Sequence, residues 1–251
     1  MGKLFGTDGI RGVVGENLTA DMAFRVGQAV GTVLMEEKGG RPTVVIGKDT
    51  RISSDMLEAA LTAGILSVGG DVLSVGTIPT PAVAFLARQE GADAGIVISA
   101  SHNPYEHNGI KVFSGQGYKL SDEVEGRIED RILSEAPMKL RTRGEIGRLV
   151  SDGGRRKVDY IDFVASTISE DLHGMRILVD CANGAASATA PSASGRFQGP
   201  YGLHPPGTRR REHQPPLRLH PPGGPGPGRG PGRYDVGVAF DATRTAACWW
   251  M

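Results

Sequence analysis

Apolar and polar positions along residues 1–135 alternate between helical and strand-like spacing. Apolar residues recur every three or four positions in four segments, which predicts helices at 19–37, 53–69, 80–89 and 121–135. Short apolar runs predict strands at 43–47, 71–76, 94–99 and 109–114. A Thr opens the first helix, a Ser opens the second, and a Pro lies in the first turn of the third. Strands alternating with helices favour an α/β fold with mixed sheets flanked by helices.

The same pattern restarts after residue 154. A helical segment, a strand and a run of small residues follow at 156–168, 175–181 and 183–191, and a strand-like run, YDVGVAFD, occupies 234–241. We therefore expect two α/β domains, the second incomplete. Their predicted limits are 1–135 for the first domain, 136–154 for a connector, 155–241 for the partial second domain and 242–251 for a tail.

The composition changes abruptly at residue 192. Residues 192–232 contain ten Pro and ten Gly in 41 positions, with no Val and no Ile. Such a run cannot bury enough apolar area to offset its chain entropy, so we expect 192–231 to be disordered. One interpretation is a flexible loop inside the second domain, although such a long loop is unusual in a compact domain.

Charge and cysteine content exclude several classes of protein. The formal net charge is zero, but residues 192–232 carry +5 and residues 1–191 carry −5, so the folded part has no electrostatic footprint for nucleic acid. The two Cys form no CxxC pair, which suits a reducing compartment. No apolar run approaches the roughly 18–20 residues that span a bilayer, and the stretch MGKLFGTDG lacks the apolar region that is typical of a signal peptide. We expect a cytoplasmic protein with no membrane or nucleic-acid partner; the oligomeric state is left open.

The stretch ISASHNPYEHNGIK (98–111) carries the clearest chemical signal. Ser101, His102 and Asn103 follow a predicted buried strand, at the sheet edge where open α/β sheets bind ligands. An exposed Ser at such a position suits a nucleophile, and without an acyl-transfer signature phosphoryl transfer is favoured. A plain turn built from Ser, Asn and Pro explains the same residues equally well.

Two further stretches suit phosphate. In FGTDGIRG (5–12), the glycines allow close backbone approach and Arg11 offers a planar fork of donors. In GKDTRISS (47–54), a basic turn precedes a helix N-terminus, which binds anions. A turn with a surface Arg and a simple helix cap are the alternatives. Lys48, Asp49 and Arg51 fit a site lining and a helix cap equally well.

Taken together, the three stretches resemble the α-D-phosphohexomutases, because FGTDGIRG, GKDTR and SASHNP followed by NGIK occur in the order and spacing of that family. The resemblance covers residues 1–191, and the FGTDGIRG form points to the branch that acts on glucosamine phosphates. It implies a phosphoserine at Ser101, a sugar 1,6-bisphosphate intermediate and Mg²⁺. Mannose or glucose phosphates are the alternative substrates. By the same resemblance, His102, Lys111 and Arg11 are catalytic, and the phosphate-binding residues are Thr7, Arg11, Asn103, Lys48 and Arg51.

The end of the chain departs from the family. The resemblance implies that Mg²⁺ is held by the phosphoserine oxygen of Ser101 and by three Asp of a DGDADR loop, of which Asp241 is the first. After VAFD the chain continues ATRTAACWWM instead. Codons can be chosen for this tail that, shifted by one nucleotide, read Gly-Asp-Ala-Asp-Arg-Cys-Leu-Leu-Val-Asp. The tail therefore predicts a one-base frameshift at the metal loop.

The run rich in Pro and Gly gives the same result. A codon choice for residues 208–222 (TRRREHQPPLRLHPP), shifted by one base, reads PDGVNIN followed by CGSTH, which the family carries between these strands. We therefore expect 192–231 to be an out-of-frame translation, and the chain to be a truncated, inactive mutase. The alternative from another class is a non-catalytic pseudogene product.

Overall fold

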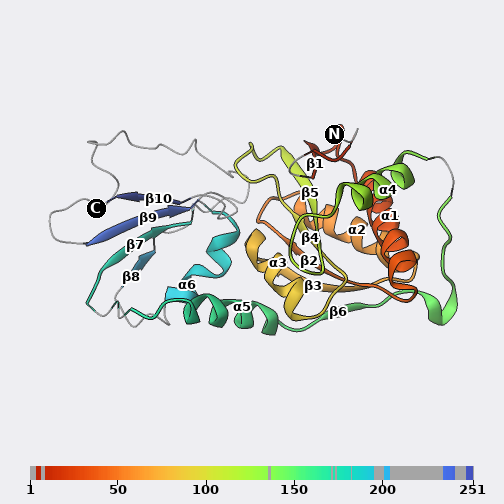
Figure 1. Ribbon diagram of the computed structural model, residues 1–251. Coiled ribbons are helices and arrows are strands. Elements are labelled where there is room, and N and C mark those ends of the chain that lie inside the picture. Colours follow the sequence, from red (N-terminus) through yellow and green to blue (C-terminus); the bar gives the residue numbers. More distant parts are fainter. Residues whose placement is uncertain are drawn as a thin grey trace.

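The computed structural model describes residues 4–6, 9–134, 137–170, 172, 174–181, 183–194, 201–203, 234–240 and 247–250. Six strands form the larger sheet, in the order β1-β5-β4-β2-β3-β6 (Figure 1). β5 runs antiparallel to both of its neighbours, whereas β4, β2, β3 and β6 pair in parallel, so the sheet is mixed. The strands are β1 (Ile10–Val13), β2 (Thr43–Lys48), β3 (Asp71–Thr77), β4 (Ala94–Ile98), β5 (His107–Ser114) and β6 (Leu149–Ser151).

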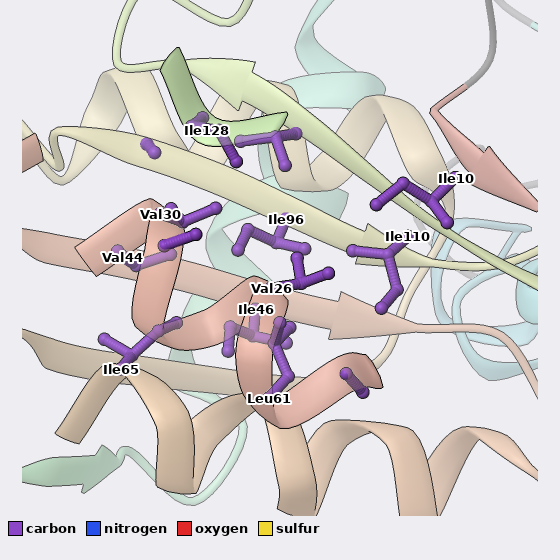
Figure 2. Close-up of a cluster of buried hydrophobic side chains, with 14 of the residues drawn as sticks. Ile10, Val26, Val30, Val44, Ile46, Leu61, Ile65, Ile96, Ile110 and Ile128 are labelled. Atoms are coloured by element: carbon purple, nitrogen blue, oxygen red, sulfur yellow. The ribbon is translucent and has the colours of Figure 1, made fainter. Parts of the chain in front are cut away.

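Helices cover both faces of this sheet, which confirms the predicted fold class. One face carries α1 (Ala20–Lys38), α2 (Ser54–Ser67) and α4 (Asp122–Leu133), and the other carries α3 (Thr80–Gln89) (Figure 1). Alternate residues of each strand point to opposite faces. In β2, Val44 and Ile46 pack among the helices of the first face, and Val45 packs against α3. Figure 2 shows the first of these clusters, where Val26 and Val30 of α1 lie among Ile46 and Ile96 of the sheet.

The predicted helix limits agree closely with the structure. The first helix begins where the Thr19 hydroxyl accepts a hydrogen bond from the Met22 amide at 3.1 Å, and it ends at Gly39 in the left-handed region. The second helix has Ser53 at its N-cap position, but the Ser53 side chain does not cap it. Instead, the Ser53 hydroxyl accepts from the Asn108 side-chain amide at 2.9 Å, so Ser53 links the start of α2 to β5.

Glycines allow α1 and α2 to pack closely. A Cβ atom at Gly64 would lie 2.1 Å from the Phe24 carbonyl oxygen, and one at Gly27 would lie 2.2 Å from the Leu61 carbonyl oxygen. Such distances are far below van der Waals contact, so only glycine fits at this crossing of two backbones. The pair of helices depends on both glycines.

The second sheet has four strands in the order β10-β9-β7-β8 (Figure 1). Its core is small: Val179, Cys181 and Ala186 are buried together. The helix α5 packs against α3 of the first domain, where Phe163 stacks on Phe85 with ring centroids 4.2 Å apart. The elements are α5 (Arg155–Ser166), β7 (Ile177–Asp180), η2 (Ala185–Ala188), α6 (Ala190–Ser194), β8 (Tyr201–Leu203), β9 (Val236–Phe240) and β10 (Ala247–Trp250).

Four strands were not predicted from the sequence, and the first of them is β1, which pairs with β5. The connector contributes a short 3₁₀ turn, η1 (Arg143–Glu145), and the edge strand β6, which pairs in parallel with β3. The expectation of disorder over 192–231 is wrong at β8, which pairs with β7, and the tail holds β10, which pairs with β9. An edge strand needs only free backbone groups on its neighbour, so it can form without a pattern of apolar side chains. Most of 192–231 lies outside the described residues.

Candidate active site

The three motifs meet at one edge of the larger sheet. β2 and β4 are parallel neighbours, with Lys48 opposite Ile98, so GKDTR and SASHNP leave the sheet side by side. β5 leads back from the second of these loops and pairs with β1, which sets Arg11 of FGTDGIRG opposite Gly109 of NGIK. Carboxyl ends of parallel strands are the usual ligand-binding edge of such sheets.

Ser101 lies in this loop with an unusual backbone conformation. Its φ angle is 57°, in the left-handed region, which costs an L-residue about 1–2 kcal/mol. Its amide donates to the Ser99 hydroxyl at 3.1 Å, and its own hydroxyl oxygen lies 3.4 Å from Nδ1 of the exposed His102. Ser101 is half-buried, so the hydroxyl remains accessible while the backbone is held.

The Arg51 side chain is hydrogen-bonded to the backbone of this loop. Its guanidinium donates to the carbonyl oxygens of Ser101, Asn103, Pro104 and His107, at 2.6 to 2.9 Å, and its Nε donates to Asp49. These contacts use all five N–H donors of an Arg side chain. The side chain is fully buried, which leaves no donor for a phosphate. The sequence-based assignment of Arg51 as a phosphate ligand is therefore revised: Arg51 binds the loop backbone.

Lys48, the other basic residue of the GKDTR turn, is bound to carboxylates. Its ammonium lies 2.6 Å from an Asp55 oxygen and also contacts Glu58. Burial by itself lowers the pKa of Lys48, but the hydrogen bonds and charges of Asp55 and Glu58 outweigh it and raise the pKa. A role in phosphate binding stays a prediction, and it requires Lys48 to exchange a carboxylate for the ligand.

Arg11 and Lys111 share one face of the sheet. Residues directly opposite each other in an antiparallel pair point to the same face, as do residues two apart in a strand. Arg11 lies opposite Gly109, and Lys111 is two residues further along β5. A Cβ at Gly109 would lie 3.0 Å from Cγ of Arg11, so the glycine makes room for this side chain next to the carbonyl of Ser99. Arg11 and Lys111 thus lie on the same face of β1 and β5, and β5 is the strand that follows the Ser101 loop.

Two buried polar residues of the site were not singled out in the sequence. The Asn108 side chain is fully buried and donates to the hydroxyls of Ser53 and Ser54, at 2.9 and 3.0 Å. Ser99 is buried and donates to Asp49 at 2.7 Å. Each is a polar residue at or beside a strand of apolar neighbours, and that interruption of the pattern is the signal that could have found them.

The second domain contacts the site where the Thr50 hydroxyl donates to the Asn183 carbonyl at 2.6 Å. A surface cavity of 460 Å³ lies elsewhere, between α3 and α5, and its lining includes Phe85, Arg88 and Phe163. The cavity contains none of the candidate site residues. Thr7 and Asp241 lie outside the described residues.

A magnesium site requires several oxygen ligands close together. Within the described ranges, no three His, Cys, Asp or Glu side chains gather closely enough to hold a metal ion. Mg²⁺ prefers several oxygen ligands, and Ser101 alone does not provide them. The described residues therefore do not fit a magnesium site, and the placement of Asp241 is untested.

Comparison with known proteins defines the class. Residues 2–139 match the phosphoglucomutase/phosphomannomutase family, α/β/α domain I. The chain therefore belongs to the phosphoglucomutase/phosphomannomutase family. A solved structure of a phosphoglucomutase/phosphomannomutase family protein from Burkholderia thailandensis is similar, with a TM-score of 0.74 and 25% identity, over 96% of this chain and 52% of that one.

Two curated relatives are more similar in sequence. The phosphoglucosamine mutase of Clostridium botulinum is 53% identical over 194 residues, which cover 77% of this chain and 43% of the relative. The phosphoglucosamine mutase of Desulforamulus reducens is 56% identical over 195 residues, covering 76% of this chain and 43% of the relative. This chain therefore spans less than half the length of the curated relatives that it matches. Among the described residues, no helix is long and apolar enough to cross a membrane.

Proposed function

We propose that this chain is the phosphoserine-bearing part of a phosphoglucosamine mutase. The observation that carries the proposal is the Ser101 loop: a half-buried hydroxyl at the carboxyl end of β4, on a backbone held by buried side chains, next to a sheet face with two cations. The identity of 53–56% with phosphoglucosamine mutases over the same residues supports the choice of branch. A sugar phosphate is the proposed ligand.

The proposed reaction moves a phosphoryl group twice. The phosphoryl group on Ser101 Oγ passes to the 1-hydroxyl of glucosamine 6-phosphate: its bond to Oγ breaks, a bond to O1 forms, O1 loses its proton and Oγ gains one. The 1,6-bisphosphate then reorients. The bond between its 6-phosphoryl group and O6 breaks, a new bond to Oγ forms, Oγ loses its proton, O6 gains one, and glucosamine 1-phosphate is released. Catalysis of this kind is mostly positioning and charge neutralisation.

Each candidate residue has a proposed part in these steps. Lys111 acts as the acid or base that exchanges a proton with the reacting oxygens, or it stabilises the charge that develops on the transferring phosphoryl group. Arg11 and Asn103 bind the phosphoryl oxygens, as does Thr7, and His102 acts beside the Ser101 hydroxyl, from which its ring is 3.4 Å away. Mg²⁺ would supply further charge neutralisation, but the described residues do not fit it, so no step is derived through the metal.

We propose further that the 251-residue chain by itself turns over negligibly, since only Asp241 of the three expected metal-binding Asp is present in the sequence. The corresponding test compares this chain with a version in which the predicted one-base shifts, at the two ends of 192–231 and at the metal loop, are reversed. The restored protein should convert glucosamine 6-phosphate, and this chain should not. A measurable mutase rate from the purified 251-residue chain contradicts this part of the proposal.

Substrate choice needs its own test, because the family includes enzymes named for glucose and mannose phosphates. Turnover of glucosamine, mannose and glucose 6-phosphates by the restored protein separates the branches. A preference for glucosamine 6-phosphate is expected, and a preference for either neutral sugar overturns the assignment. The cytoplasmic location stays a prediction.

A further inference from the structure

The loop that carries Ser101 is irregular, and one side chain binds most of its backbone oxygens. From residue 101 to residue 107, four carbonyl groups accept hydrogen bonds from Arg51. Irregular backbone next to a core needs such partners, because unpaired buried carbonyls are costly. Arg51 lies about fifty positions earlier in the chain, so the loop is held from outside itself.

Asp49 connects Arg51 to the start of the Ser101 loop. Its Oδ2 accepts from Arg51 Nε at 2.9 Å and from the Ser99 hydroxyl at 2.7 Å. Because the Ser99 hydroxyl proton is directed to Asp49, a lone pair of the same oxygen accepts from the Ser101 amide. The peptide groups on both sides of Ser101 are thus fixed: its amide through Ser99 and Asp49, and its carbonyl through Arg51.

The two charges of this pair are buried together. The side chains of Arg51 and Asp49 are 0% and 1% exposed. A buried pair of this kind is maintained only when its remaining donors and acceptors are satisfied, as they are here. Lysine cannot replace Arg51, since an ammonium has three donors at one point and the guanidinium has five in a planar fork.

We propose that the Asp49–Arg51 pair is the positioning device of the Ser101 loop: it holds the Ser101 backbone in its left-handed conformation and so directs the hydroxyl, without contacting substrate or phosphate. The importance of the pair for catalysis rests on the proposed function of Ser101. The positioning of the loop is independent of that function, because it follows from contacts among residues of this chain.

Hydrogen exchange followed by mass spectrometry tests the proposal on this chain. In Arg51→Lys, peptides covering 99–108 should exchange at least about tenfold faster, while peptides from α1 and β2 keep their wild-type rates. The matched control is Arg156→Lys, because Arg156 is also buried and paired, with Glu90 and Asp152, but lies on α5 away from the loop. Unchanged exchange in 99–108 of Arg51→Lys, or the same increase in Arg156→Lys, overturns the proposal.

A second variant keeps the test decisive if Arg51→Lys does not fold. Ser99→Ala removes only the link from Asp49 to the Ser101 amide. In a nitrogen-15 NMR spectrum of the native chain, the Ser101 amide signal should move in Ser99→Ala and stay in place in Arg156→Lys, whereas general destabilisation would not shift a native-state signal. An unmoved Ser101 signal overturns the proposal.

The failure of this inference and the failure of the proposed function are distinguishable. Ser101→Ala keeps the backbone contacts of the loop and removes the hydroxyl that the phosphoryl transfer needs. It should retain slow exchange over 99–108. Fast exchange in Ser101→Ala would mean that the hydroxyl, and not the Asp49–Arg51 pair, orders the loop.

Discussion

Replacing Gly64 with Ala should destabilise the protein, although Ala is the better helix former. Gly64 lies on α2 where this helix crosses α1, and an added Cβ would lie 2.1 Å from the Phe24 carbonyl oxygen and 2.9 Å from the Gln28 nitrogen. Both neighbours are backbone atoms, so no side chain can rotate away. The two helices must move apart.

The size of the effect follows from this geometry. An ordinary contact of 3.4 Å requires the oxygen and the new carbon to separate by about 1.3 Å, and a gap of about 1 Å already loses up to half of the dispersion energy across an interface. Overpacked cores lose about 1–3 kcal/mol, while the higher helix propensity of Ala returns about 1 kcal/mol. The expected net loss in the free energy of unfolding is therefore up to about 2 kcal/mol.

Gly126→Ala is the matched control. Gly126 is an exposed interior residue of α4, and an added Cβ meets nothing within 4 Å. The same substitution should therefore stabilise the protein, by up to about 1 kcal/mol. Urea denaturation followed by far-ultraviolet circular dichroism measures both variants. If Gly64→Ala is as stable as Gly126→Ala, the close crossing of α1 and α2 is refuted.

Three further predictions concern single side chains. The carboxylate of Asp152 is partly buried, but it accepts from the Arg156 and Gly154 amides, and these bonds together with the Arg156 charge lower its pKa. A carboxyl whose pKa is lowered on folding stabilises the fold above its ordinary pKa, and this stabilisation is lost as the pH falls through the lower folded pKa. Asp152→Asn should therefore destabilise the protein more at pH 7 than near pH 3 in urea denaturation, and an equal effect at both pH values contradicts this. Glu129 accepts from the Leu4 and Phe5 amides, so Glu129→Gln should speed tryptic cleavage after Arg11, and unchanged cleavage contradicts the anchoring. In the restored protein, Ser101→Ala should abolish mutase turnover while leaving the free energy of unfolding within about 0.5 kcal/mol of wild type, and retained turnover removes Ser101 as the phosphoryl carrier.

The four central strands of the larger sheet and its helices could be predicted because their signals are local. The helix at Ala20–Lys38 begins with a Thr cap and ends with a Gly, and β2 and β4 are continuous apolar runs. The edge strands β6 and β8 carry no such pattern, since they are fixed by pairing with β3 and β7. The glycines at the α1–α2 crossing also gave no local signal, because their requirement comes from the opposite helix.

The candidate active-site residues were predicted from their residue types and local context, whereas their roles depend on tertiary structure. Ser101 was found because a polar loop follows a buried strand. Arg51 was expected to bind phosphate because an Arg in a basic turn is typical of such sites. Its actual partners are carbonyls of a loop some fifty residues later, and only the fold brings them together. Ser99 was overlooked because it was counted with the predicted strand 94–99, and Asn108 because it directly precedes the predicted strand 109–114.

The central claim is that Ser101 carries the phosphoryl group of a phosphoglucosamine mutase. The most direct measurement incubates the frame-restored protein with glucosamine 1,6-bisphosphate and locates the phosphate by tandem mass spectrometry. We expect one phosphoryl group, on Ser101 and not on Ser99, with release of a glucosamine monophosphate. Phosphate on another residue, or on none while the protein turns over glucosamine 6-phosphate, would contradict it.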